Sequence, residues 1–287
     1  LSLCCPRGGN TLKIAKIEDL HCDAGWRDFS FLKITTDDGI VGFLPTRAQL
    51  SVALPSGISF TGNFSATKAN FKALGYMDLI DLDARHGPTD ATIVFSSNIA
   101  YDYDRSNGIT PGRIDFETVA SHEIGHALGF VSAVDTVDYL LNTGQTGSVS
   151  ITPLDLFRFR DAVAGADPSS PAEFTSFPRF LGTGGNAIFD DLALEIPMST
   201  GEHSGDGHEA SHWKDDTLHG SLLGVMDPSL NGGVTELISN ADLRALDLIG
   251  YRFNQRYTVP EPGAAMVPIA TATLALRRPR NNRPSRP

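Results

Sequence analysis

Hydrophobic and polar residues alternate along parts of the chain, and this alternation predicts strands. Residues 13–43 begin with one alternating run, and a second β-rich run follows that an Asp-Gly turn interrupts. Residues 90–101 also predict a strand, and the polar stretch after them predicts a hairpin turn closed by Asn107-Gly108. A long Gly- and Pro-bearing stretch extends to about Ser211. The fold class expected is α+β with an irregular middle.

Apolar positions with a helical period predict the helices. Three start and stop signals stand out: Ser65 as a possible N-cap, Asp115 as a cap, and a Ser239–Asp242 capping box on a helix that Gly250 ends. In the last helix Leu243, Leu246 and Ile249 share one apolar face.

Composition narrows the possible functions. The chain has 287 residues and a net charge of -11, and its last 29 residues carry five arginines and one glutamate, which leaves -15 on the remainder. An acidic body argues against nucleic-acid binding, which needs a basic face. The three cysteines, Cys4, Cys5 and Cys22, all precede residue 23, so the body cannot rely on disulfides or thiolate metal sites.

His122, Glu123 and His126 form an H-E-x-x-H pattern inside the helix that Asp115 caps. Residues four apart share a helix face, so both imidazoles can bind one ion, and Glu123 projects beside them toward a water. In this pattern zinc lowers the pKa of the water and the glutamate takes its proton. Two exposed helix histidines are the plain alternative, and we favour the zinc site.

Two histidines do not complete a zinc site, so a third ligand is needed. Gly129 can turn the chain back under the metal, but the next position of the compact metzincin pattern holds Ser132. Asp135 could supply a carboxylate close in sequence. Otherwise a histidine far downstream returns to the site.

The downstream residues resemble the leishmanolysin-type metzincins and bacterial surface metalloproteases similar to them. The resemblance spans roughly residues 90–255 and is carried by "SHEIGHALGF", "ASHWKDD" with His212, "GVMDP" with Met226, and "ADLRALDLIGY". It implies a twisted sheet, an active-site helix, His212 as the third ligand and a Met-turn at Met226 beneath the zinc. Asp135 is then better interpreted as a helix-exit residue or a support of the ligands.

Other residues compete for metal roles. His203, His208 and His219 lie near His212 in sequence, but only His212 has the "SHW" setting, and the others are interpreted as exposed or supporting residues. Asp102 and Asp104 suggest calcium, yet the glycine is one place too late for an EF-hand and the final glutamate is absent. No calcium ligand is predicted there.

The two ends of the chain resemble other proteins. Residues 13–43, notably "KITTDDGIVGF", resemble the N-terminal hairpin of enolase-superfamily enzymes, but no metal-binding barrel follows, so a sugar-acid dehydratase is not favoured. Residues 259–287 combine Pro-Glu-Pro, an apolar stretch and arginines, which resembles the PEP-CTERM sorting signal of Gram-negative bacteria. A disordered basic tail is the alternative.

The sorting resemblance implies exosortase processing, transient membrane contact through the tail, and an exported protein at the cell surface or envelope. The apolar stretch 263–276 would be about 21 Å long as a helix, short of a hydrocarbon core of roughly 30 Å, so a permanent span is not expected. No lysine/arginine-then-apolar leader stands at the N-terminus, which we interpret as a displaced or truncated start.

Together these patterns predict three parts: a leader with a hairpin fragment (1–43), a zinc metalloprotease domain (44–258) and a sorting tail (259–287). We expect a zinc-dependent endopeptidase acting on extracellular or envelope proteins. His122, His126 and His212 would hold Zn²⁺, and Glu123 would be the general base. The alternative is a non-catalytic zinc-binding surface or matrix protein, and the presence of Glu123 argues against it.

Overall fold

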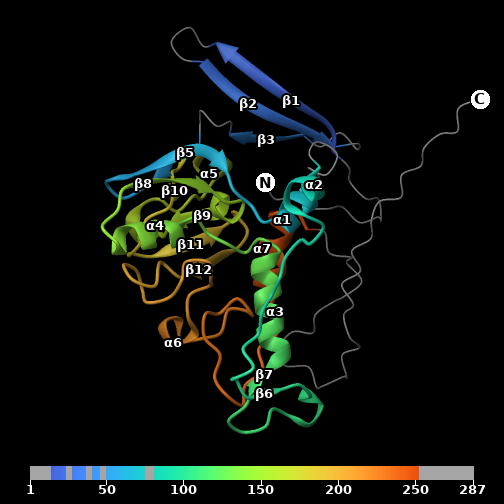
Figure 1. The fold of residues 1–287 in the computed structure, drawn as a ribbon. Helices are drawn as coiled ribbons and strands as arrows, with labels where there is room; N and C mark the ends of the chain where they lie inside the picture. The colour runs from blue at the N-terminus through green and yellow to red at the C-terminus, as the bar shows by residue number, and fades with distance from the viewer. Residues whose placement is uncertain (1–13, 24–27, 37–40, 46–49, 75–80, 252–287) are drawn as a thin grey trace, which may run out of the picture. The chain divides into compact units, whose positions relative to one another are not determined.

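The computed structural model describes residues 14–23, 28–36, 41–45, 50–74 and 81–251 (Figure 1). Its strands are β1 (Ile14–Asp23), β2 (Asp28–Thr36), β3 (Val41–Pro45), β4 (Val52–Ala53), β5 (Ile58–Phe64), β6 (Tyr101–Asp102), β7 (Ile114–Asp115), β8 (Gly147–Ile151), β9 (Arg158–Arg160), β10 (Arg179–Phe180), β11 (Ala187–Asp190) and β12 (Glu195–Met198). Its α-helices are α1 (Lys68–Ala73), α2 (Leu82–His86), α3 (Phe116–Ala127), α4 (Val134–Asn142), α5 (Pro171–Ser176), α6 (Asp216–His219) and α7 (Asn240–Leu248). Short 3-10 turns are η2 (Arg105–Asn107), η3 (Leu154–Phe157) and η4 (Ala162–Ala164). The predicted α+β class is confirmed.

The N-terminal strands form an antiparallel sheet in the order β1-β2-β3. The second predicted run is therefore two strands, β2 and β3, and the Asp-Gly turn between them lies outside the described residues. Strand β3 ends at Pro45, two residues past the boundary predicted at residue 43. The division into domains itself stays a prediction, and the tail 259–287 lies outside the described residues.

The strands of the body form several small sheets. Strands β12, β11 and β9 pair antiparallel in that order, whereas β4 with β10, β5 with β8, and β6 with β7 pair parallel. No sheet in the described body has more than three strands. The twisted sheet of the metzincin fold therefore stays a prediction.

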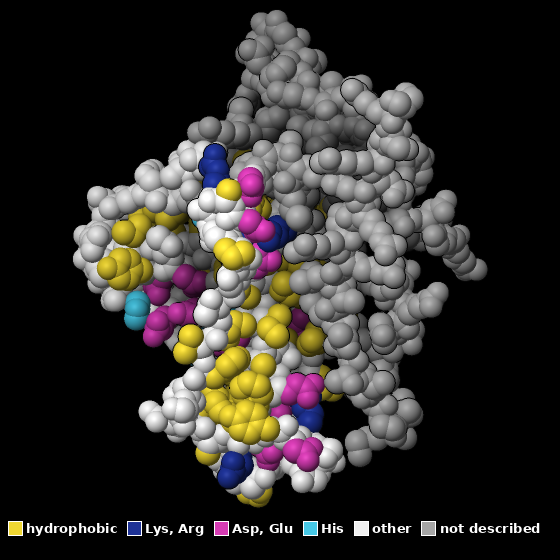
Figure 2. Space-filling model, turned by 45° about the vertical axis from the view of Figure 1, so that its right-hand side comes forward, with side chains coloured by type: hydrophobic (Ala, Val, Ile, Leu, Met, Phe, Trp, Pro, Cys, Tyr) yellow, Lys and Arg dark blue, Asp and Glu magenta, His cyan; other side chains and the backbone are white. Residues whose placement is uncertain are grey.

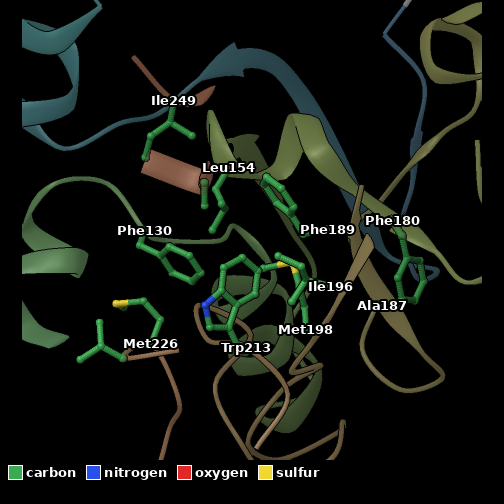
Figure 3. Close-up of a cluster of buried hydrophobic side chains, with 12 residues drawn as sticks. Phe130, Leu154, Phe180, Ala187, Phe189, Ile196, Met198, Trp213, Met226 and Ile249 are labelled. Atoms are coloured by element: carbon green, nitrogen blue, oxygen red, sulfur yellow. The ribbon is translucent and has the colours of Figure 1, made fainter. Parts of the chain in front are cut away.

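The largest group of buried apolar side chains surrounds Trp213, which is fully buried (Figure 3). Its indole ring lies 4.8 Å from the Phe130 ring and 5.7 Å from the Phe189 ring, both edge to face. Met226 lies at the margin of the same cluster. Burying a side chain of this size stabilises the fold by roughly 2–3 kcal/mol. Because Trp213 directly follows His212, this core also fixes the backbone that carries His212.

The strand predicted over residues 90–101 is wrong except at its end. Only Tyr101 belongs to a strand, β6, and residues 91–100 have no strand partner. Val94 is 87% exposed, whereas Ile93 and Phe95 are partly buried, and the Phe95 ring lies 4.9 Å from the Phe116 ring of α3. Figure 2 shows that exposed hydrophobic side chains gather on one face of the molecule. Alternation of exposed and partly buried side chains therefore does not make a strand unless a neighbouring segment pairs with the backbone.

The hairpin turn predicted at Asn107-Gly108 is also wrong, because the strands on either side, β6 and β7, are parallel. The carboxylate of Asp102 accepts hydrogen bonds from the backbone N–H groups of Asp104 and Thr110. Asp104 likewise accepts from the N–H and hydroxyl of Ser106. These carboxylates therefore support a loop that joins parallel strands.

The helix signals were mostly correct. Asp115 caps α3, and Ser239 with Asp242 forms the capping box of α7. Helix α1 differs, because its N-cap is Thr67, which accepts a hydrogen bond from Asn70, and not Ser65. The buried positions are Asp242 and Ala245 in α7 and Ile249 directly after it, and Leu246 is partly buried beside the apolar cluster. No helix in the described chain is long and apolar enough to cross a membrane.

Candidate metal centre

Helix α3 places His122 and His126 on one face. Asp115 caps the helix by accepting hydrogen bonds from the N–H groups of Glu117 and Thr118, which leaves the helix regular through the motif. The two Nε2 atoms lie 3.1 Å apart. The predicted one-turn spacing therefore brings both nitrogens to a single point.

His212 reaches the same point from the loop that follows β12. Its Nε2 lies 3.1 Å from Nε2 of His122 and 3.2 Å from Nε2 of His126, although 86 residues separate it from His126. The three side chains form a group whose ligand atoms all lie within 4.8 Å of one another. The structure thus brings together the three residues predicted as ligands.

The other ring nitrogens determine which tautomer each histidine adopts. Nδ1 lies 2.8 Å from the Val225 carbonyl in His122, 2.8 Å from the Phe130 carbonyl in His126, and 3.1 Å from the Glu209 carbonyl in His212. A carbonyl oxygen only accepts, so each Nδ1 must donate its proton. The three neutral rings therefore turn bare Nε2 lone pairs toward one another, and a cation between them would remove the repulsion.

Burial keeps the rings of His122 and His212 neutral. Desolvation, together with the electrostatic effect of the neighbouring His126 and His122 side chains, lowers the pKa of His212 to about 3. Burial also lowers the pKa of His122. At neutral pH these two imidazoles therefore have the unprotonated form that binds metal.

The donor set fits zinc. Zn²⁺ bonded to imidazole at about 2.05 Å with tetrahedral angles separates its nitrogen ligands by about 3.3 Å. The observed separations of 3.1–3.2 Å are close to that value. Three neutral imidazoles also leave one position open, as in catalytic zinc sites.

Glu123 follows His122 on α3 and is half-buried. Within the described part of the chain its carboxylate makes no hydrogen bond or ion pair with another residue. It is also not among the residues that could jointly hold the ion. Glu123 is therefore free to interact with a water or a substrate beside the metal position.

Met226 packs against Gly125 of α3. The turn Gly224–Asp227 closes with a hydrogen bond of 3.1 Å from Asp227 N–H to the Gly224 carbonyl. Met226 is 2% exposed, and a Cβ placed on Gly125 of α3 would overlap its sulfur and lie 3.2 Å from its terminal methyl. Gly125 lies between the two histidines in sequence, so its missing side chain makes room for the methionine.

The sequence pattern predicts Asp242 as part of a helix capping box, but it does not predict that this carboxylate also binds distant groups. Its carboxylate accepts hydrogen bonds from the N–H groups of Val225 and Met226 at 2.9 and 3.3 Å and from the Trp213 indole at 2.8 Å. Asp242 is 1% exposed. One buried carboxylate therefore joins the turn under the helix to the residue after His212. The capping-box pattern gave no signal of these distant partners.

Asp135 does not lie among the candidate ligands. It accepts a 2.6 Å hydrogen bond from the N–H of Ala210 and another from the Ser211 hydroxyl. The Ser211 hydroxyl in turn accepts from the N–H of Ser132. Asp135 therefore supports the backbone just before His212, consistent with its interpretation as a supporting residue. Burial raises its pKa, and these two hydrogen bonds oppose that shift.

Gly129 has the positive φ, 111°, expected of a glycine that ends a helix and redirects the chain.

The three histidines that compete with His212 in sequence have other neighbours. His203 is close to Glu202, His208 to Asp215, and His219 to Ser221. None of these three belongs to the ligand group around His212.

Comparison with protein-family models, curated proteins and solved structures gives no match to this chain.

The close packing of Gly125 against Met226 predicts that an alanine at residue 125 changes the stability in the opposite direction from usual. Replacing a helix-interior glycine with alanine normally stabilises a protein by up to about 1 kcal/mol. Here Gly125→Ala should destabilise by about 1–3 kcal/mol, because the new methyl overlaps Met226. Urea denaturation measures the change.

The control places the same substitution in a Met226→Ala variant, in which the space beside Gly125 is no longer filled by the methionine side chain. There Gly125→Ala should be neutral or stabilising, and the two substitutions should show coupling in a double-mutant cycle. Greater stability of Gly125→Ala in the wild-type background would contradict the packing described.

Asp135 gives a second prediction. Asp135→Ala removes both acceptors near His212, so zinc affinity should fall about tenfold while zinc still binds. Asp135→Asn retains one acceptor and should recover most of the affinity. Competition with a chromophoric chelator measures both.

Asp138→Ala is the matched control on the same helix. Asp138 is also buried and also accepts two backbone hydrogen bonds, but from His203 and Ser204. Its loss should leave zinc affinity unchanged. Equal weakening by both alanine variants would indicate general destabilisation and not support of His212.

Proposed function

We propose that this protein is a zinc-dependent endopeptidase of the metzincin type. The observation that carries the proposal is the convergence of three bare Nε2 atoms at 3.1–3.2 Å, with Glu123 next to His122 in the sequence of α3. The packing of Met226 against Gly125 of α3 adds support, because the resemblance implies a Met-turn near the helix that carries the first two histidines.

His122, His126 and His212 would hold the zinc. When bound, it would supply Lewis acidity to a water molecule and to the scissile carbonyl. The carboxylate of Glu123 accepts the proton of the attacking water and then passes it to the leaving amine. The three carbonyl partners keep each imidazole in the tautomer and orientation that this chemistry needs.

The alternative is a non-catalytic zinc-binding surface or matrix protein, with the same three histidines stabilising the fold. A purely structural site gains nothing from a carboxylate held next to the metal without a partner of its own. The freedom of Glu123 within the described chain therefore favours catalysis.

The substrate and location follow from the sequence resemblance. We propose that the substrates are extracellular or envelope proteins, and that the tail 259–287 directs the exported enzyme to the surface of a Gram-negative cell through an exosortase.

Glu123→Gln separates metal binding from catalysis. The variant should keep about one zinc per chain, because Glu123 is not among the candidate ligands. It should lose at least about a hundredfold of its activity, because the water lacks its proton acceptor. Elemental analysis and digestion of unfolded casein measure the two properties on the same sample.

His212→Ala is the companion variant and should lose zinc, because two imidazoles on one helix leave the site incomplete. His219→Ala is the control, since His219 interacts with Ser221 away from the site. Full casein digestion by Glu123→Gln would end the proposed mechanism. Zinc retained by His212→Ala would remove His212 from the ligand set.

A further inference from the structure

Arg158 carries a buried positive charge that the proposed peptidase mechanism does not use. It is the first residue of β9, and its side chain is 0% exposed. Burial lowers its pKa, and the charges of Asp155, Asp135 and Asp206 oppose that shift, although none of the described residues forms an ion pair with it. Burying a guanidinium without a paired carboxylate is unfavourable, and an apolar side chain would fill the same space more easily. The groups that the guanidinium binds explain its place in the core.

All the hydrogen bonds of the Arg158 side chain go to two segments that lead to His212. Its Nη2 donates to the Ser199 carbonyl at 2.7 Å, and its Nη1 donates to the Ala210 carbonyl at 3.3 Å. The same Nη1 lies 3.3 Å from the sulfur of Met198. Nε is buried and has no partner in the described chain. The side chain therefore extends from the start of β9 to the residues after β12 and to the residue two places before His212.

The segment after β12 is itself paired with the backbone of His212. The N–H of Ser199 donates to the His212 carbonyl at 3.1 Å, and its hydroxyl donates to the Trp213 carbonyl at 2.8 Å. Met198 forms an antiparallel bridge with Trp213. By binding the Ser199 carbonyl, Arg158 holds the segment that lies beside the third histidine.

The two peptide groups before Ser211 are held from different elements. In the first, the N–H of Ala210 donates to Asp135 of α4 at 2.6 Å, and the Glu209 carbonyl lies 3.1 Å from Nδ1 of His212. In the second, the Ala210 carbonyl accepts from Arg158 of β9. Each peptide group is planar, so only the φ and ψ angles of Ala210 relate one to the other. Fixing the second peptide group therefore also fixes the direction of the carbonyl that binds the His212 ring.

We propose that Arg158 is a positioning residue for His212. By holding the Ala210 and Ser199 carbonyls, it keeps the Glu209 carbonyl in place to accept from Nδ1 of His212, so that Nε2 faces the metal position. This inference rests on the proposed zinc site and assigns to Arg158 no contact with the metal. Arginine suits the role because its planar fork donates to two carbonyls in fixed directions, whereas lysine offers a single ammonium group.

Metal binding to the full-chain variants Arg158→Met and Arg158→Lys tests the proposal. Competition with a chromophoric chelator should show zinc affinity at least about tenfold weaker for Arg158→Met. Arg158→Lys keeps the charge and one donor group, so it should recover part of that loss. The visible absorption of bound Co²⁺ depends on the ligand geometry and should change in both variants. Neither readout needs peptidase activity.

Arg179→Met is the matched control. Arg179 is 1% exposed, forms no ion pair with a described residue, and donates to the carbonyls of Leu156 and Phe177. Its loss should lower Tm about as much as the loss of Arg158, because both variants leave buried carbonyls without a donor. Zinc affinity and the Co²⁺ spectrum should stay as in the wild type.

Equal weakening of zinc binding by Arg158→Met and Arg179→Met would overturn the proposal, because it would reflect lost stability alone. Wild-type zinc affinity in Arg158→Met, or in Arg158→Lys where the methionine variant does not fold, would also overturn it. If His212→Ala loses zinc while the Arg158 variants bind it normally, only this inference fails and the proposed zinc site stands. Zinc retained by His212→Ala would remove the ligand that Arg158 is proposed to position and would contradict both.

Discussion

Three backbone carbonyl oxygens, those of Val225, Phe130 and Glu209, determine where the histidine side chains direct their lone pairs. Each carbonyl accepts from a ring Nδ1 and leaves Nε2 unprotonated and directed inward. A cation among the three Nε2 atoms would remove the repulsion between their lone pairs. Each carbonyl also belongs to a segment that the core holds in place, so the geometry of the site depends on the packing of the whole body.

Trp213 and Asp242 make the main contacts that hold the histidine-bearing segments in place. Trp213 fills the centre of the largest apolar cluster (Figure 3), and Asp242 binds its indole N–H together with the backbone of Val225 and Met226. Since His212 precedes Trp213 and His122 bonds to Val225, one buried carboxylate couples the third histidine to the first. This arrangement explains how His122 and His212, 90 residues apart, can still bring their Nε2 atoms within 3.1 Å of each other.

Local signals in the sequence predicted local structure well. The caps at Asp115 and Ser239 and the spacing of His122 and His126 depend on neighbours within one or two helical turns, and these were correct. The strand over residues 90–101 failed because alternation does not reveal whether a partner strand exists. His212 came from a family resemblance, because no local spacing relates it to α3. The distant role of Asp242 left no trace in the sequence pattern, since its partners are two backbone N–H groups and an indole that lies 29 residues away. Asp135 was interpreted as a support of the ligands only through the family resemblance.

Anomalous diffraction from crystals of the full chain, grown with zinc and recorded on both sides of the zinc absorption edge, tests the central claim most directly. The account predicts one strong peak about 2.0–2.1 Å from Nε2 of His122, His126 and His212, with the three Nδ1 atoms still bonded to their carbonyls. A zinc peak at other residues, or no peak among these histidines in zinc-saturated crystals, would contradict it.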